Sequence, residues 1–132
     1  MEEVIEKLRA INAKRVFVQF PEGFKLKIQA IGKELEKNGF ETYLCLDSTW
    51  GACDIREDEA KRLKCDAILH IAHSDFGVKA DIPVIYYDYF LNGNPQPILE
   101  KEFSKLENYQ KIGLVTSLQF IPATKKVKEF LE

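Results

Sequence analysis

Cys53 is the residue of this sequence whose surroundings best suit chemistry. It lies in Trp50-Gly51-Ala52-Cys53-Asp54, a turn of small residues before a predicted helix over 54–64, with Asp54 as its expected N-cap. Backbone N–H groups and the helix dipole at such a position stabilise a thiolate, the form of cysteine that binds metals. The competing interpretation is a buried thiol that only fills space. We expect Cys45 and Cys65, which lie in or beside predicted strands, to be structural thiols.

The number and spacing of the cysteines limit what they can do together. There are three of them, an odd number, and no two have the CxxC spacing. This argues against a disulfide framework and against a self-contained zinc site, so we expect reduced thiols.

Three polar loops are predicted to share one edge of the fold. In open parallel α/β sheets ligands bind beyond the carboxyl ends of the strands, and here those ends are followed by 21–23, 47–53 and 73–75. Glu22 is an expected ligand contact, with a solvated turn residue as the alternative. The residues that we expect to line this crevice are Pro21, Glu22, Gly23, Trp50, Gly51, Ala52, His73 and Ser74.

The two histidines form an HxxH pattern, His70 and His73. Residues three apart on an extended strand point to opposite faces, so we do not expect them to chelate one ion. We expect His70 to be a core histidine and His73, nearer the strand end, to contact ligand. A weaker alternative is a small-molecule enzyme that uses His73 and Asp75 as acid and base.

Motifs and composition exclude several function classes. The sequence has no GxxxxGK[ST], GxGxxG or GxSxG pattern, so nucleotide-triphosphate and serine-hydrolase functions lose their main support. A net charge of -2 gives no general attraction for nucleic acid or anionic membrane. No apolar run approaches the roughly 20 residues that span a bilayer. Without a signal layout at the start, the expected location is the cytoplasm.

The elements that position these residues alternate between strand and helix. Apolar spacing predicts strands at 15–20, 40–46, 66–70 or 66–72, 83–87 and 111–117. Helices are predicted at 1–12, 26–37, 54–64, 97–108 and from 123 onward, the second of them closed by Asn38-Gly39. The expected fold is therefore α/β, with a mostly parallel four- to five-stranded sheet flanked by helices.

One short pattern occurs twice. The first strand closes with Val18-Gln19-Phe20-Pro21 and the last predicted strand with Leu118-Gln119-Phe120-Ile121-Pro122. Each is strand, Gln-Phe, proline, then helix. The pattern indicates either a duplicated unit or a chance match.

Four stretches together resemble a known family, the diphthamide synthesis enzymes that begin the modification of a histidine on elongation factor 2. They are 16–24 (VFVQFPEGF), 50–54 (WGACD), 65–74 (CDAILHIAHS) and 112–120 (IGLVTSLQF). Their order and spacing are similar to those of the family.

The resemblance implies both an architecture and a chemistry. Family members look like three repeated α/β domains, each supplying one cysteine to a [4Fe-4S] cluster. The cluster cleaves S-adenosylmethionine to a 3-amino-3-carboxypropyl radical, which alkylates the histidine. Cys53 then corresponds to the first domain's ligand, whereas Cys45 and Cys65 match no cluster position. The crevice residues named above would line the S-adenosylmethionine or substrate site.

The resemblance also implies that further domains complete the site. We expect 1–95 to be the first domain and 96–132 the helix, strand and helix start of a truncated second repeat. One thiolate cannot hold a cluster that needs three protein ligands, so we expect no catalytic residue in isolation and no activity without a complementing polypeptide. Elongation factor 2 would be the protein substrate. The alternative is a stand-alone scaffold module that binds a partner through the aromatic segment 86–90.

Overall fold

A four-stranded parallel sheet organises the first of two units in the computed structural model, which describes residues 1–132. The units are Met1–Asp88 and Tyr89–Glu132. The strand order is β2-β1-β3-β4, and every pair is parallel. The two central strands are almost wholly buried, because helices cover both faces of the sheet. The strands are β1 (Arg15–Gln19), β2 (Glu41–Leu44), β3 (Ala67–Ile71) and β4 (Val84–Tyr87).

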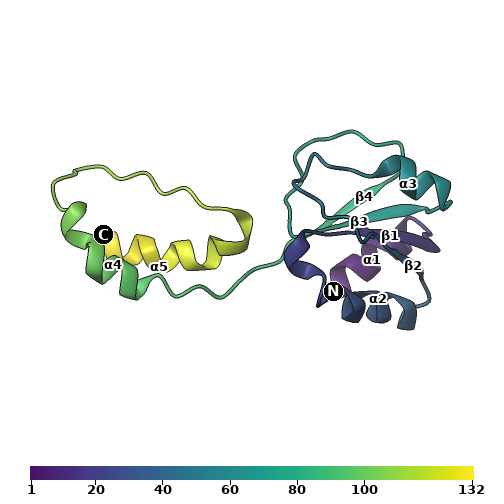
Figure 1. The fold of residues 1–132 in the computed structure, drawn as a ribbon, viewed down its shortest axis with the longest axis horizontal. Coiled ribbons are helices and arrows are strands. Elements are labelled where there is room, and N and C mark those ends of the chain that lie inside the picture. The colour runs from purple at the N-terminus through teal and green to yellow at the C-terminus, as the bar shows by residue number, and fades with distance from the viewer. The chain divides into compact units, whose positions relative to one another are not determined.

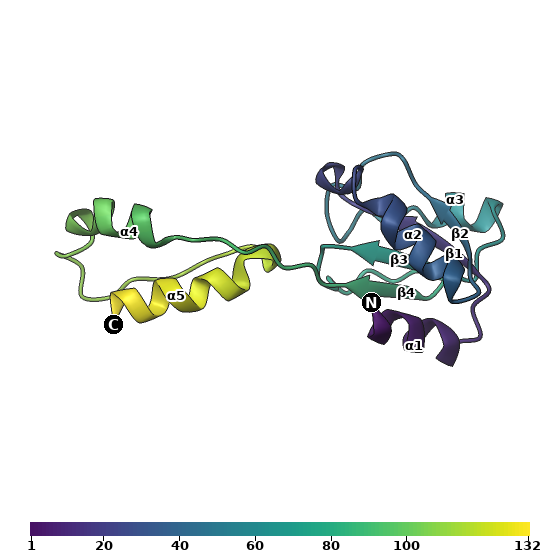
Figure 2. The ribbon, with the colours of Figure 1, turned by 90° about the horizontal axis from the view of Figure 1, so that it is seen from below.

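Three helices cover this sheet. Helices α1 (Glu2–Ala10) and α2 (Ile28–Lys37) lie on one face, and α3 (Glu57–Arg62) lies on the other (Figures 1 and 2). The first helix buries Val4, Ile5 and Leu8, which recur at helical spacing. The predicted α/β fold with a mostly parallel sheet is confirmed, with four strands.

Two local devices set where the elements of this unit begin and end. Gly39 has φ +91°, a left-handed conformation that glycine adopts at little cost, and it ends α2 as Asn38-Gly39 predicted. The Asp66 carboxylate accepts hydrogen bonds from the backbone N–H groups of Lys14 and Arg15 at 2.7 and 2.8 Å. These bonds lower the pKa of Asp66 and join the start of β1 to the turn before β3.

The face of the sheet under α3 changes character along the strands. Phe17 and Ile68 are register partners on β1 and β3, and both belong to the apolar core beneath this helix. Two residues further along, Gln19 pairs with His70, and His70 pairs with Tyr86 on β4. Side chains two residues apart on a strand share a face. A polar row therefore crosses three strands at their carboxyl ends.

The second unit contains helices but no strand. Its elements are α4 (Gln96–Glu102), the 3-10 turns η2 (Phe103–Lys105) and η3 (Leu118–Phe120), and α5 (Ile121–Leu131). The rings of Phe103 and Phe130 pack edge to face at 5.4 Å. The helix predicted over 97–108 ends in a 3-10 turn, and the last helix begins two residues earlier than predicted.

The strand predicted at 111–117 is not formed in the structure. The segment has no ladder partner, and Val115 is 98% exposed. A strand needs a neighbour to pair its backbone groups, so apolar alternation alone cannot produce one. The assignment of 96–132 to a second repeat stays a prediction. None of the helices in either unit has the length and apolar content that a bilayer crossing requires.

Candidate functional site

The loops that follow β1 and β2 are joined at the carboxyl edge of the sheet. The Ser48 hydroxyl donates to the carboxylate of Glu22, and the backbone N–H of Thr49 donates to the carbonyl of Phe20 at 3.0 Å. Glu22 also pairs with Lys25 at 2.8 Å, and these contacts with Lys25 and Ser48 lower its pKa. These contacts hold the Glu22 carboxylate at the junction of the two loops, and its contact with a ligand stays a prediction.

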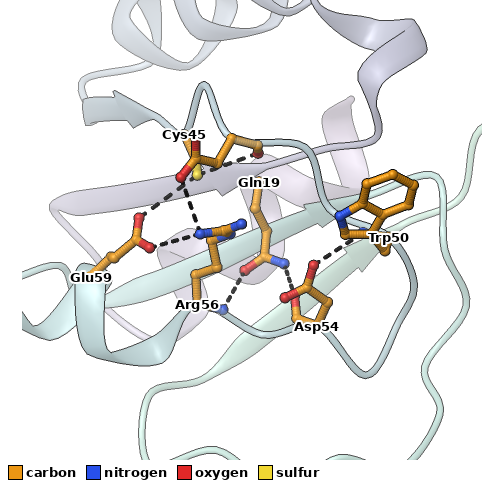
Figure 3. A network of polar contacts seen from close by, with 7 residues as sticks. Gln19, Cys45, Trp50, Asp54, Arg56 and Glu59 are labelled. Atoms are coloured by element: carbon orange, nitrogen blue, oxygen red, sulfur yellow. Dashed lines mark hydrogen bonds and ion pairs between the residues drawn. The ribbon is translucent and has the colours of Figure 1, made fainter.

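The loop that carries Cys53 is closed on itself by two reciprocal hydrogen bonds. The backbone N–H of Trp50 donates to the Asp54 carboxylate at 3.1 Å (Figure 3), and the N–H of Asp54 donates to the Gly51 carbonyl at 3.0 Å. The Tyr86 hydroxyl reaches the Ala52 carbonyl at 3.5 Å. The sequence around Cys53 therefore forms a defined turn that is tied to β4.

Cys53 is the exposed cysteine of the chain, whereas Cys45 and Cys65 are buried. Burial raises the pKa of Cys45, and it raises the pKa of Cys65 to about 11. Both buried thiols therefore stay protonated near neutral pH, as expected for structural residues. Cys53 has no protein hydrogen-bond partner, which leaves its sulfur available to an external group.

The predicted link between Cys53 and a helix N-terminus is wrong. Helix α3 begins at Glu57, and its N-cap position is Arg56, not Asp54. The Asp54 carboxylate turns back to Trp50 instead, which removes it from the capping position. Since the dipole effect fades within one turn, the short α3 does not act on Cys53, four residues before its first residue.

Gln19 holds the end of the cysteine loop against the sheet. Its side chain is fully buried at the end of β1. Its Nε2 donates to the Asp54 carbonyl at 2.5 Å, and its Oε1 accepts from the backbone N–H of Arg56 at 3.1 Å (Figure 3). One carboxamide thus pairs with a carbonyl and an N–H that would otherwise lack partners.

The two histidines lie together, which corrects the expectation that they point to opposite faces. His70 Nε2 and His73 Nδ1 are 2.8 Å apart. The strand ends at Ile71, and Ala72 has φ +65°, so the chain turns before His73. A non-glycine residue in this conformation is strained and marks a turn that the surrounding structure holds in place.

Burial keeps the two imidazoles neutral. His70 is 0% exposed, as expected for a core histidine, and its ring stacks on that of Tyr86 at 5.2 Å. Desolvation, with a smaller contribution from His73, lowers the pKa of His70 to about 4. Desolvation also lowers the pKa of His73, against an opposing effect of Asp54. Both rings are therefore uncharged near neutral pH.

A charged cluster lies beside the buried Cys45. The Arg56 guanidinium pairs with Glu59 at 2.9 Å and with Asp47 at 3.3 Å, while the Cys45 thiol lies 3.6 Å from the Asp47 carbonyl (Figure 3). The cluster joins the loop after β2 to α3. It supports the cysteine loop without adding a metal ligand to it.

The remaining predicted crevice residues lie around this frame. Pro21 precedes the 3-10 turn η1 (Glu22–Phe24), which contains Gly23. Trp50 is 89% exposed, Ser74 is exposed and His73 is half-buried. No group of three His, Cys, Asp or Glu side chains could hold a metal ion by itself.

Sequence reasoning missed Gln19 and Tyr86 as parts of the site. The available signal was a polar residue inside the otherwise apolar run Val16-Phe17-Val18-Gln19-Phe20. A buried carboxamide requires partners, and the cysteine loop supplies them. For Tyr86 the sequence indicates only that it belongs to the aromatic segment 86–90.

Comparisons with known proteins show which family the chain is similar to. Residues 20–132 match the family model of the diphthamide synthesis proteins. The chain is 34% identical over 131 residues to the 2-(3-amino-3-carboxypropyl)histidine synthase of Pyrococcus horikoshii, covering 98% of this chain and 38% of the relative. It is also 34% identical over 128 residues to subunit 1 of the Saccharomyces cerevisiae synthase, covering 94% of this chain and 30% of that subunit.

A solved structure shows the same architecture. The crystal structure of Dph2 from Pyrococcus horikoshii with a 4Fe-4S cluster superposes with a TM-score of 0.89 at 33% identity. The match covers 98% of this chain and 39% of that one. The chain thus spans about two fifths of this relative's length.

Proposed function

The chain belongs to the diphthamide synthesis protein family, and on that premise we propose that it forms the N-terminal part of a 2-(3-amino-3-carboxypropyl)histidine synthase in which Cys53 is one ligand of a [4Fe-4S] cluster. The observation that carries the proposal is the setting of Cys53. It is the exposed thiol of the chain, on a closed turn tied to two strands, in a fold that matches a cluster-containing relative.

The residues around Cys53 suit one cluster ligand and no more. Thiolate sulfur is the usual ligand of iron–sulfur clusters. The nearby Asp54 carboxylate is occupied by the Trp50 N–H and does not compete for iron. Since no three His, Cys, Asp or Glu side chains of the chain form a metal site, we expect the remaining ligands to come from outside residues 1–132.

On this proposal the chain's own residues hold and orient the thiol. Gln19 binds the Asp54 carbonyl, directly after Cys53, and the Tyr86 hydroxyl contacts the Ala52 carbonyl, directly before it. A rigid ligand loop reduces the ordering that binding requires. A bound cluster would supply the electron for cleavage of S-adenosylmethionine to a 3-amino-3-carboxypropyl radical.

The proposal extends to substrate and partners. The product named for the relatives is an alkylated histidine, and we infer that the acceptor is a histidine of elongation factor 2 in the cytoplasm. Polypeptide carrying two further cysteines completes the site. Glu22, Gly23, His73 and Ser74 would line the S-adenosylmethionine or substrate crevice with Pro21, Trp50, Gly51 and Ala52.

Anaerobic reconstitution tests the role of Cys53. The chain is combined with polypeptide that carries the other two cysteines, then treated with iron and sulfide, and visible absorbance and iron content are measured. We expect a [4Fe-4S] cluster in the combination and none with the chain alone. We expect the substitution Cys53→Ala to abolish the cluster signal.

Cys45→Ser is the matched control, because Cys45 is buried beside Arg56 and Glu59. It should retain the cluster. A Cys53→Ala protein with the full absorbance and iron content would overturn the proposal. Absence of a cluster both in the chain alone and in the combination would instead favour the alternative function, a scaffold module that shares the fold and binds a partner through 86–90.

A further inference from the structure

The Gln19 carboxamide has only one orientation that satisfies its surroundings. Its oxygen accepts from the Arg56 N–H, and its nitrogen donates to the Asp54 carbonyl. The reversed amide would place oxygen against a carbonyl and nitrogen against an N–H, which breaks both bonds. The backbone of the cysteine loop thus fixes which atom of Gln19 is the donor.

The donor orientation of Gln19 determines the tautomer of His70. The second N–H of the Gln19 amide faces His70 Nδ1 at 3.2 Å, so Nδ1 must accept. A neutral imidazole has one donor and one acceptor nitrogen. His70 therefore carries its proton on Nε2, which lies 2.8 Å from His73 Nδ1.

The same rule determines which ring nitrogen of His73 carries the proton. Its Nδ1 accepts from His70, so its proton lies on Nε2, for which the structure shows no protein partner. The half-buried ring is held by the turn at Ala72. His73 thus presents a single N–H donor at the carboxyl edge of the sheet, beside the Cys53 loop.

We propose that His73 Nε2–H binds the carboxylate of the 3-amino-3-carboxypropyl moiety of S-adenosylmethionine, and that Gln19 and His70 are positioning residues that keep it a donor. The inference rests on the proposed function. The polar groups of that moiety are an ammonium, which only donates, and a carboxylate, which only accepts. A fixed neutral donor pairs with the carboxylate and rejects the ammonium.

The first test measures the tautomers by NMR. The chain has two histidines, so long-range ¹H–¹⁵N correlations of the imidazoles are simple to assign. We expect both rings to carry the proton on Nε2 at neutral pH. Gln19→Glu removes the donor facing His70, and we expect the protons of both rings to move to Nδ1. Gln29→Glu, the same change at an exposed position of α2, should leave both rings unchanged.

The second test measures ligand selectivity in the chain combined with polypeptide that carries the other cysteines. S-adenosylmethionine should shift the His73 Nε2 resonance, and its decarboxylated analogue should bind about 10- to 100-fold more weakly, as expected for loss of one charge-assisted hydrogen bond. His73→Leu should abolish this discrimination, while His73→Gln, which keeps an N–H donor, should retain part of it.

Any one of three results would overturn the inference. A wild-type His73 protonated on Nδ1, equal binding of the two ligands, or no His73 shift with either ligand each contradicts it. These outcomes are separable from failure of the proposed function. The tautomer measurement needs no cluster, whereas the role of Cys53 is decided by cluster content alone.

Discussion

The buried His70 imidazole should make the stability of the parallel sheet depend on pH. Burial lowers its pKa to about 4, whereas an unfolded histidine titrates at about 6.5. Between these values the unfolded chain binds a proton that the folded chain does not. The free energy of unfolding from this source is therefore complete above pH ~6.5 and is lost as the pH falls toward ~4.

The size of the effect follows from the difference between the two pKa values. A gap of about 2.5 units corresponds to about 3 kcal/mol in full. Between about pH 7.5 and about pH 5, where most but not all of the titration occurs, the expected loss is about 2 kcal/mol. This is a large fraction of the 5–15 kcal/mol by which domains are typically stable.

Urea denaturation followed by far-UV circular dichroism measures this loss. Carboxylates also begin to titrate near the lower pH, so the comparison is with His70→Gln, which removes only the imidazole. We expect the variant to lose about 2 kcal/mol less than the wild type over the same interval. Equal losses in the two proteins would refute the reasoning. An NMR titration gives an independent check, since a His70 pKa near 6.5 would contradict it without requiring the variant to fold.

Three further predictions concern the first unit. Phe20→Ala should lower the free energy of unfolding by about 3–5 kcal/mol, because the ring is fully buried, and a loss below about 1 kcal/mol in urea denaturation would contradict this. Gly39→Ala should cost about 1 kcal/mol because φ is +91° there, whereas Gly23→Ala, which meets no atom within 4 Å, should be nearly neutral by the same measurement. Iodoacetamide should modify Cys53 in the folded chain well before the two buried cysteines, as read by peptide mass spectrometry. Equal modification of all three would count against the structure of this loop.

Much of the sheet could be predicted because local sequence and burial agree there. The apolar runs of β1 and β3 have the composition of strands covered on both faces. Asn38-Gly39 ends a helix because Gly39 readily adopts the positive φ found there. The segment 111–117 has a similar apolar character but forms no strand. A strand forms only where a neighbouring strand can pair with its backbone, and the segment's own sequence does not show whether that neighbour exists.

The site could be predicted only in part, since its main contacts cross the sheet. The convergence of three loops follows from strand polarity. The turn around Cys53 could be predicted from its small residues, but the helix expected to follow it directly begins only at Glu57. The contact between His70 and His73 depends on the left-handed backbone angle of Ala72. That angle cannot be predicted from the residue type, because alanine rarely adopts it. The role of Gln19 depends on the backbone of 54–56, 35 residues away at its Asp54 contact.

The sheet order carries a consequence for how the chain is made. The partner of β1 on its inner side is β3, and Gln19 and His70 are 51 residues apart. At a synthesis rate of about 5–20 residues per second, β1 waits roughly 3–10 s for that partner to be translated. During this interval the apolar strand can pair only with β2 and cover itself with α1 and α2. The buried apolar side chains of β1 therefore lack part of their cover during synthesis, and slower translation between β2 and β3 should lower the yield of folded protein.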